Sequence, residues 1–150
     1  MSDTNNQIVE ALKKVLGDTY ALYLKTHGYH WNVEGPNFKS LHDLFEENYK
    51  ALFLSMDDVA ERIRALGAYA PAGGKALAEL ASIESGDNDV PSANAMLQNL
   101  VAGHESFLIT ARKAMGLAGD GSDTATEDVL SPLIAAHEKM AWMLRSSLER

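Results

Sequence analysis

Residues 38–67 have the sequence FKSLHDLFEENYKALFLSMDDVAERIRALG, which holds the clearest helical pattern in the chain. Its apolar residues recur every three or four positions until Gly67 ends the pattern. That period places them along one face of an α-helix and leaves the charged residues on the other faces. The members of this apolar stripe are Phe38, Leu41, Phe45, Tyr49, Leu52, Met56, Val59, Ile63 and Leu66. We therefore predict a long amphipathic helix that ends at Gly67.

A second long helix precedes this one. Between residues 4 and 33 the apolar positions again have helical spacing. Gly35 and Pro36 predict a tight turn after it, because glycine tolerates unusual backbone angles and proline cannot continue a helical hydrogen-bond ladder. Asn37 is placed to cap the start of the following helix. Two helices joined by a short turn are therefore expected in the first half of the chain.

The second half of the chain contains two more helices after a long connection. Residues 67–91 hold several Gly and Pro, which predicts a crossover with a short helix over residues 75–83. Ser92 starts a third long helical pattern, which ends at a group of glycines. Thr124 and Glu127 have the spacing of a capping box, which predicts the start of a fourth long helix. Two short turns and one long crossover indicate an all-α, ferritin-like four-helix bundle.

Composition limits the class of protein. At 150 residues with 46% hydrophobic content, the chain can bury the core of one domain, which we expect to span residues 1–150. There is no run of about eighteen apolar residues and no charged-then-apolar leader, so we expect a cytoplasmic protein without a membrane span. The lack of Cys excludes disulfides, thiolate metal sites and cysteine nucleophiles. Histidines and carboxylates remain as the strong metal ligands.

The charge of the chain favours cations over polyanions as partners. Lys and Arg total 13 against 21 Asp and Glu, which gives a formal net charge of -8. The basic residues are scattered, and residues 1–7 contain none. Because nucleic-acid binding needs a clustered basic surface or tail, we expect DNA binding to be weak or absent.

Two pairs of possible metal ligands lie on the helix predicted over residues 38–66. His42 and Glu46 are four residues apart, as are Asp57 and Glu61, so each pair lies on one helical face beside the apolar stripe. Glu46 and Asp57 are eleven residues apart, which is about 16 Å along a helix. One chain therefore cannot bring both pairs to the same metal cluster.

The spacing of the two pairs is symmetric, which suggests how the site is completed. The pair 42 and 61 and the pair 46 and 57 share one midpoint, between Ala51 and Leu52. If two copies of this helix cross antiparallel at that point, His42 faces the partner subunit's Glu61 and two equivalent sites form per dimer. His30 comes just before the Gly-Pro turn and can join His42 from the same chain, giving an imidazole and carboxylate shell suited to iron.

Simpler explanations for these residues remain open. A histidine and three carboxylates on an exposed helix are often a solvated face, and Asp58 with Arg62 has the spacing of an ordinary ion pair. His27, His104 and His137 lack a partner set and are expected to pack or to hydrogen-bond. The Glu-x-x-His motif of diiron sites inside a bundle is absent, which favours a site between subunits.

Three segments together resemble one family. THGYHWNVEGPNF (26–38), LHDLFEENY (41–49) and MDDVAERIRALG (56–67) are similar to the motif run of the Dps-type miniferritins, the DNA-binding proteins from starved cells within the ferritin-like superfamily. The resemblance implies that His30 and His42 ligate iron together with Asp57 and Glu61 of the partner subunit. It also implies a second-iron or water-holding role for Glu46.

The resemblance carries further expectations about function. The family forms hollow dodecamers built from two-fold dimers, with two irons at each inter-subunit site. It oxidises ferrous iron, preferably with hydrogen peroxide rather than O2, and stores the ferric mineral inside. Trp31 resembles the family's tryptophan beside the iron site, where it would take up an electron or a radical, although packing at the helix end explains it equally well.

Acidic residues gather at the predicted turn before the fourth long helix, where relatives have an iron-entry pore. They are Asp120, Asp123, Glu127 and Asp128. Helix dipoles also favour acidic residues at a helix start, so both explanations stay open for this cluster, with Asp120 and Asp128 the better pore candidates.

Three classes of function follow, in order of support. The first is a ferroxidase and iron store that protects against oxidative damage. The second is a nucleoid-packing protein of the same family, which would act at the nucleoid. This sequence lacks the lysine-rich extension of the DNA-binding members, which argues against that function. The third is an inert helical assembly module, which leaves the symmetric ligand spacing without a cause.

Overall fold

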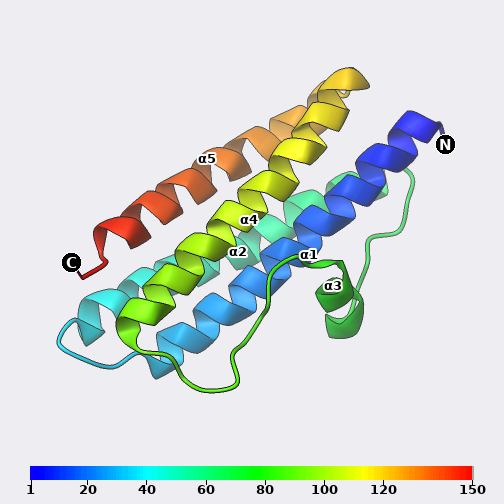
Figure 1. Cartoon of the computed structure of the whole chain (residues 1–150). Coiled ribbons are helices and arrows are strands. Elements are labelled where there is room, and N and C mark those ends of the chain that lie inside the picture. Colours follow the sequence, from blue (N-terminus) through cyan, green and yellow to red (C-terminus); the bar gives the residue numbers. More distant parts are fainter. Residues whose placement is uncertain (150) are drawn as a thin grey trace.

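The computed structural model describes residues 1–149, in which five helices are found. A short turn joins α1 (Asp3–Asn32) to α2 (Phe38–Ala65), and another joins α4 (Ala93–Asp120) to α5 (Thr124–Ser146). The long connection between α2 and α4 contains the short helix α3 (Gly74–Leu80). The four long helices form a bundle, and α3 packs on the outside of α1 (Figure 1). The prediction of an all-α four-helix bundle with a short crossover helix is confirmed.

Serine side chains cap two of the long helices. The Ser2 hydroxyl accepts a hydrogen bond from the amide of Asn5 at the start of α1, at 3.1 Å. At the start of α4, the Ser92 hydroxyl accepts from the amide of Ala95 at 3.2 Å, which confirms the cap predicted there. Such bonds satisfy amides that have no partner within the helix. In the part of the chain that the structure describes, no helix is long and apolar enough to cross a bilayer.

The predicted cap at Asn37 is correct in position but not in chemistry. Asn37 is the residue before α2, yet its side chain makes no capping hydrogen bond. Its backbone carbonyl instead accepts from the amide of Leu41 at 3.0 Å. Gly35 has a φ of +116°, a conformation that glycine adopts without strain, which explains the tight turn.

The predicted capping box at the start of α5 is wrong. The cap is Asp123, whose carboxylate accepts from the amide of Thr126 at 3.0 Å, whereas Thr124 is already the first helical residue. Arg62 of α2 donates to the same two residues, at 2.9 Å to the Asp123 carboxylate and 2.9 Å to the Thr126 hydroxyl. The predicted ion pair between Asp58 and Arg62 is therefore also wrong, because the guanidinium binds the α4–α5 turn instead.

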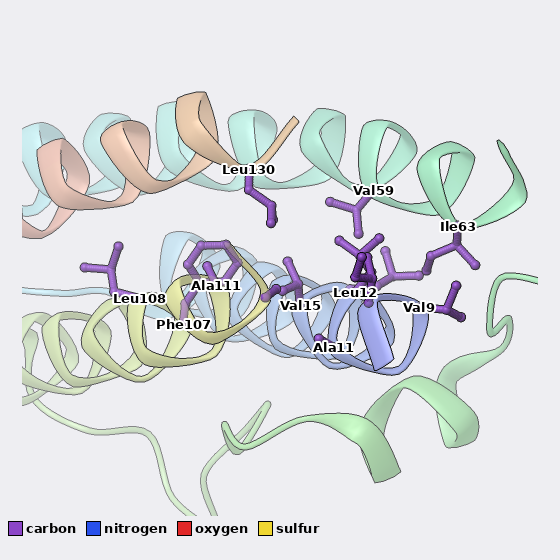
Figure 2. Close-up of a cluster of buried hydrophobic side chains, with 13 residues drawn as sticks. Val9, Ala11, Leu12, Val15, Val59, Ile63, Phe107, Leu108, Ala111 and Leu130 are labelled. Atoms are coloured by element: carbon purple, nitrogen blue, oxygen red, sulfur yellow. The ribbon is translucent and has the colours of Figure 1, made fainter. Parts of the chain in front are cut away.

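The core runs along the bundle and contains residues from all four long helices. Figure 2 shows one cluster of it, in which Leu12 of α1, Val59 of α2 and Leu130 of α5 have no exposed surface. Removing such side chains from water stabilises the fold by about 1.5–3 kcal/mol each. Most of the apolar stripe on α2 is buried or half-buried, as predicted, but Phe38 in the first turn is 42% exposed.

A buried carboxylate fixes the crossover to the bundle. Asp18 of α1 has no exposed surface and accepts from the Ser82 amide at 2.6 Å, the Ser82 hydroxyl at 3.0 Å and the Thr110 hydroxyl at 2.6 Å. At the neighbouring Gly17, a Cβ would lie 2.9 Å from the carbonyl oxygen of Leu77 in α3. The crossover therefore lies close against α1 and α4 at a defined position.

We predict that Asp18→Ala lowers the free energy of unfolding by about 1–3 kcal/mol, because the donors of Ser82 and Thr110 lose the buried carboxylate that accepts from them. Urea denaturation followed by circular dichroism measures this. Glu84→Ala removes an exposed carboxylate from the same connection and should change stability by less than about 0.5 kcal/mol. Equal losses in the two variants would contradict the proposed anchor.

Two buried histidines join α4 to α5. The Nδ1 atoms of His104 and His137 lie 2.9 Å apart, and the His137 ring stacks on Phe107 at 3.5 Å between centroids. One Nδ1 must donate and the other accept, so the pair holds only one proton between these atoms. Burial lowers the pKa of His104 to about 3. Burial, and then His104, also lower the pKa of His137 well below its ordinary value.

We predict that the free energy of unfolding falls as the pH is lowered from about 7.5 to about 5. The unfolded chain binds protons at these histidines near their ordinary pKa of 6.5, whereas the folded chain does not, so stability present above 6.5 is lost below it. Each histidine contributes about 2 kcal/mol of this loss at about pH 5. Urea titrations at several pH values measure this free energy. In the double variant His104→Leu, His137→Phe, the free energy of unfolding should change less with pH than in the native chain. An unchanged pH dependence would show that these histidines do not cause the loss.

Candidate metal centre

His30 and His42 hold each other at the junction of α1 and α2. The Nδ1 of His30 lies 2.8 Å from the carbonyl oxygen of His42, and the Nδ1 of His42 lies 2.7 Å from the carbonyl oxygen of His30. Their rings stack at 3.8 Å between centroids with 16° between the planes. The His30 carbonyl is in the last turn of α1, where it lacks a partner within the helix, so His42 also caps α1.

These two hydrogen bonds decide which ring nitrogens can bind a metal. A carbonyl oxygen only accepts, so each Nδ1 must carry the proton. Nε2 is then the ring nitrogen whose lone pair can ligate a metal. A backbone carbonyl on the other nitrogen is the usual way in which proteins orient a metal-binding histidine. The pair is therefore prepared as two adjacent nitrogen donors.

A carboxylate lies next to this histidine pair. The Oε1 of Glu46 is 4.0 Å from the Nε2 of His30, and its Oε2 is 3.6 Å from the Nζ of Lys50. Glu46 comes one helical turn after His42, which explains why it faces the same side. Imidazole nitrogen and carboxylate oxygen are donor types suited to iron and similar divalent ions.

The second predicted pair lies far from the first. Asp57 and Glu61 are exposed on the same continuous helix α2, and nineteen residues separate His42 from Glu61, which is about 28 Å of helix. Within residues 1–149, no group of three or more His, Cys, Asp or Glu side chains is placed to hold a metal ion. A single chain thus does not bring the two candidate ligand pairs together.

Exposed apolar residues lie between the two half-sites. Phe53 is 56% exposed and Leu54 is 70% exposed, close to the midpoint predicted for a two-fold axis. With Tyr23, Tyr49 and Lys50 they line an open hollow of about 400 Å³. Exposed aromatic and aliphatic residues gathered in this way are typical of a protein–protein contact. This is the place where a second copy of α2 would have to pack.

Trp31 lies beside the histidine pair and faces outward. It is 65% exposed, and its ring lies 4.2 Å from that of His27 between centroids. Neither a core position nor a fixed hydrogen bond accounts for it.

The acidic residues at the α4–α5 turn have different environments. Burial opposes ionisation of Asp123, but hydrogen bonds from Thr126 and the Arg62 guanidinium hold its pKa below the ordinary value. Asp123 therefore caps α5 and forms an ion pair with Arg62. Asp120 and Asp128 are exposed, while Glu127 is half-buried in the first turn of α5.

Comparison with known proteins identifies the family. The model of the ferritin-like domain matches residues 9–150. The DNA protection during starvation protein 2 of Bacillus anthracis is 36% identical, over 97% of this chain and 99% of that protein. The chain belongs to the Dps family of ferritin-like proteins. The resemblance carried by the histidine, Gly-Pro and Asp-x-x-x-Glu segments is confirmed.

Two other relatives extend the comparison. A low temperature-induced protein of Nostoc is 41% identical over 99% of this chain and 84% of its own length. The Dps protein of Vibrio cholerae O1 has a crystal structure that matches with a TM-score of 0.91 and 34% identity, covering 97% of this chain and 91% of that one. That structure is described as a member of a superfamily of ferritin-like diiron-carboxylate proteins.

Sequence reasoning missed how the site is held in place. The reciprocal bonds between His30 and His42 join residues twelve apart across a turn, and no periodicity reports such a contact. The contact of Tyr23 with His27, at 3.1 Å between the hydroxyl and Nδ1, could have been suspected from their i,i+4 spacing. His104 and His137 do hydrogen-bond, as expected, but to each other.

Proposed function

We propose that this Dps protein is a ferroxidase and iron store that protects against oxidative damage. It would oxidise ferrous iron, with hydrogen peroxide preferred over O2, at sites that each take two irons. Each site would lie between two subunits related by a two-fold axis, and the ferric mineral would collect inside a hollow dodecamer. Iron is here a substrate and a cargo. On the basis of the family we place this activity in the cytoplasm.

The observation that carries the proposal is the pair of reciprocal hydrogen bonds between His30 and His42. Both bonds are made by Nδ1, so both Nε2 atoms are available on adjacent, stacked rings. The bonds that close the end of α1 thus also turn both Nε2 atoms away from the backbone. Glu46, with its Oε1 4.0 Å from the Nε2 of His30, supplies the carboxylate expected beside them.

The other half of the site would come from a second chain. Asp57 and Glu61 are exposed on α2, and their mirrored spacing matches an antiparallel pair of α2 helices. The apolar residues Phe53 and Leu54 lie between the half-sites and provide a surface that such a pair would bury. Asp57 and Glu61 of the partner subunit would then complete a shell of nitrogen and oxygen donors.

This donor set agrees with the proposed chemistry. Carboxylates are hard ligands that favour the ferric state, which lowers the energy needed to oxidise ferrous iron. Two irons together can deliver both electrons that a peroxide requires, without releasing a hydroxyl radical. Trp31, exposed and next to His30, would serve as an additional electron donor.

Iron would enter through the acidic α4–α5 turns where subunits meet. Asp120 and Asp128 are exposed and carry this part of the proposal. Asp123 and Glu127 would contribute mainly negative potential, because Asp123 is bound to Arg62 and Glu127 lies in the first turn of α5.

We predict that His42→Ala and Asp57→Ala each reduce the initial rate of iron oxidation roughly tenfold or more, since even a group that only orients a ligand contributes that much. Absorbance after addition of ferrous iron and peroxide measures the rate. When the two variants are co-assembled in equal amounts, roughly a quarter of the sites should regain both ligands, because each mixed dimer contains one intact site. Recovery of activity on mixing is the specific expectation for a shared site.

The matched control is co-assembly of His30→Ala with His42→Ala. Both residues belong to the same half-site, so every mixed dimer still lacks a ligand in each site and no activity should return. Native rates in His42→Ala would overturn the ferroxidase assignment. Recovery in neither mixture would overturn the shared site.

DNA compaction is the second candidate, and the charge of the chain argues against it. We predict no retarded DNA band in a gel-shift assay at about 0.15 M salt, since a net charge of -8 repels a polyanion. A retarded band that weakens as the salt is raised would show that this protein also binds DNA.

A further inference from the structure

A cluster of aromatic rings lies beside the histidine pair, on the face shared by α1 and α2. Tyr23, His27 and Trp31 are spaced four residues apart on α1, so they line up along one side of that helix. Tyr49 and Phe53 of α2 meet them there: Tyr23 lies 6.2 Å from Tyr49 and 5.7 Å from Phe53 between ring centroids. We call these five residues the aromatic cluster.

The cluster is continuous with the candidate iron ligands. The rings of His27 and Tyr49 stack at 3.9 Å with 12° between their planes, and Tyr49 lies 5.2 Å from His30. His30 in turn stacks on His42. Neighbouring rings therefore connect the candidate site to Tyr23 without an aliphatic gap, and electrons pass readily between π-systems in contact.

Tyr23 differs from Tyr49 in having a base on its hydroxyl. The oxygen of Tyr23 lies 3.1 Å from the Nδ1 of His27. At this distance the Nδ1 of His27 can accept the phenolic proton in the tautomer that carries its own proton on Nε2. A phenol that loses an electron becomes a strong acid, so a neighbouring base makes its oxidation much easier.

We propose that Tyr23, with His27 as its proton acceptor, stores one oxidising equivalent when peroxide meets a site that holds only one ferrous ion. The inference rests on the proposed ferroxidase function and adds two residues to it. Without such a donor, one ferrous ion would reduce peroxide to hydroxide and a free hydroxyl radical. The Tyr23 phenol supplies the missing second electron.

The step balances in electrons and atoms. The ferrous ion gives one electron and the Tyr23 phenol gives one electron and its proton, while the peroxide O–O bond breaks and accepts both electrons. The products are a ferric ion, a neutral phenoxyl radical, one water and one hydroxide. The phenol proton passes to Nδ1 of His27, and His27 releases a proton from Nε2 toward the hydroxylic products. A second ferrous ion later reduces the phenoxyl, which regains a proton from water.

Other oxidisable side chains are less suited to this role. Trp31 touches His27 but is 65% exposed, so a radical there would be open to solvent. Tyr29 also has a base, since its hydroxyl donates to Asp87 at 2.6 Å, but its ring contacts Phe45 on the core side of α1. Tyr23 combines a proton acceptor, partial burial and contact with the cluster.

The test uses the assembled protein loaded with one ferrous ion per site and then mixed with peroxide. Rapid-freeze electron paramagnetic resonance should show a phenoxyl radical in the native chain. Tyr23→Phe should lose most of that signal, and a spin trap in the solution should capture more hydroxyl radical. His27→Gln keeps the phenol but removes the base, so its phenoxyl signal should fall as well. Tyr69→Phe removes an exposed phenol outside the cluster and is the matched control, with a native signal expected.

Iron oxidation is measured in the same samples to separate the two proposals. If the native chain oxidises iron but Tyr23→Phe keeps the full phenoxyl signal, the role of Tyr23 is wrong and the ferroxidase stands. If the native chain does not oxidise iron at all, both proposals fail. A lost signal in Tyr23→Phe together with a native signal in Tyr69→Phe supports the storage role.

Discussion

The reciprocal hydrogen bonds between His30 and His42 are the constraint on which the rest of the site depends. They satisfy a carbonyl at the end of α1 that the helix itself leaves unpaired. They also fix the rotation of α2 relative to α1, because each bond joins a rigid ring on one helix to a backbone carbonyl of the other. The same contact sets the tautomer of each imidazole. One pair of residues thus terminates a helix, aligns two helices and orients the two nitrogens that we propose as metal donors.

Much of the fold and the candidate site could be predicted from local patterns. The apolar stripe of α2 and the i,i+4 pairs that begin at His42 and Asp57 depend only on helical geometry, so they can be recognised in the sequence. Arg62 could not be assigned correctly, because its partner Asp123 is sixty-one residues away and reaches it only in the folded bundle. For the same reason, the local capping-box pattern at Thr124 predicted the wrong cap: Asp123 caps α5 and is held there by Arg62 of α2.

One face of α2 carries both charged and apolar residues. Its ends carry the charged residues of the candidate half-sites, while its middle exposes Phe53 and Leu54. If two copies pack through this apolar middle, association itself brings the carboxylates to the histidines. Binding of iron and association of subunits would then be coupled, because each stabilises the arrangement that the other requires.

The uninterrupted course of α2 restricts how this sequence can change in length. Eleven residues separate Glu46 from Asp57, which is close to three full turns at about 3.6 residues per turn, so both point to the same side. Inserting or deleting a single residue between them would rotate one half-site by about 100° relative to the other. In the proposed two-fold dimer, both sites would then be lost in one event.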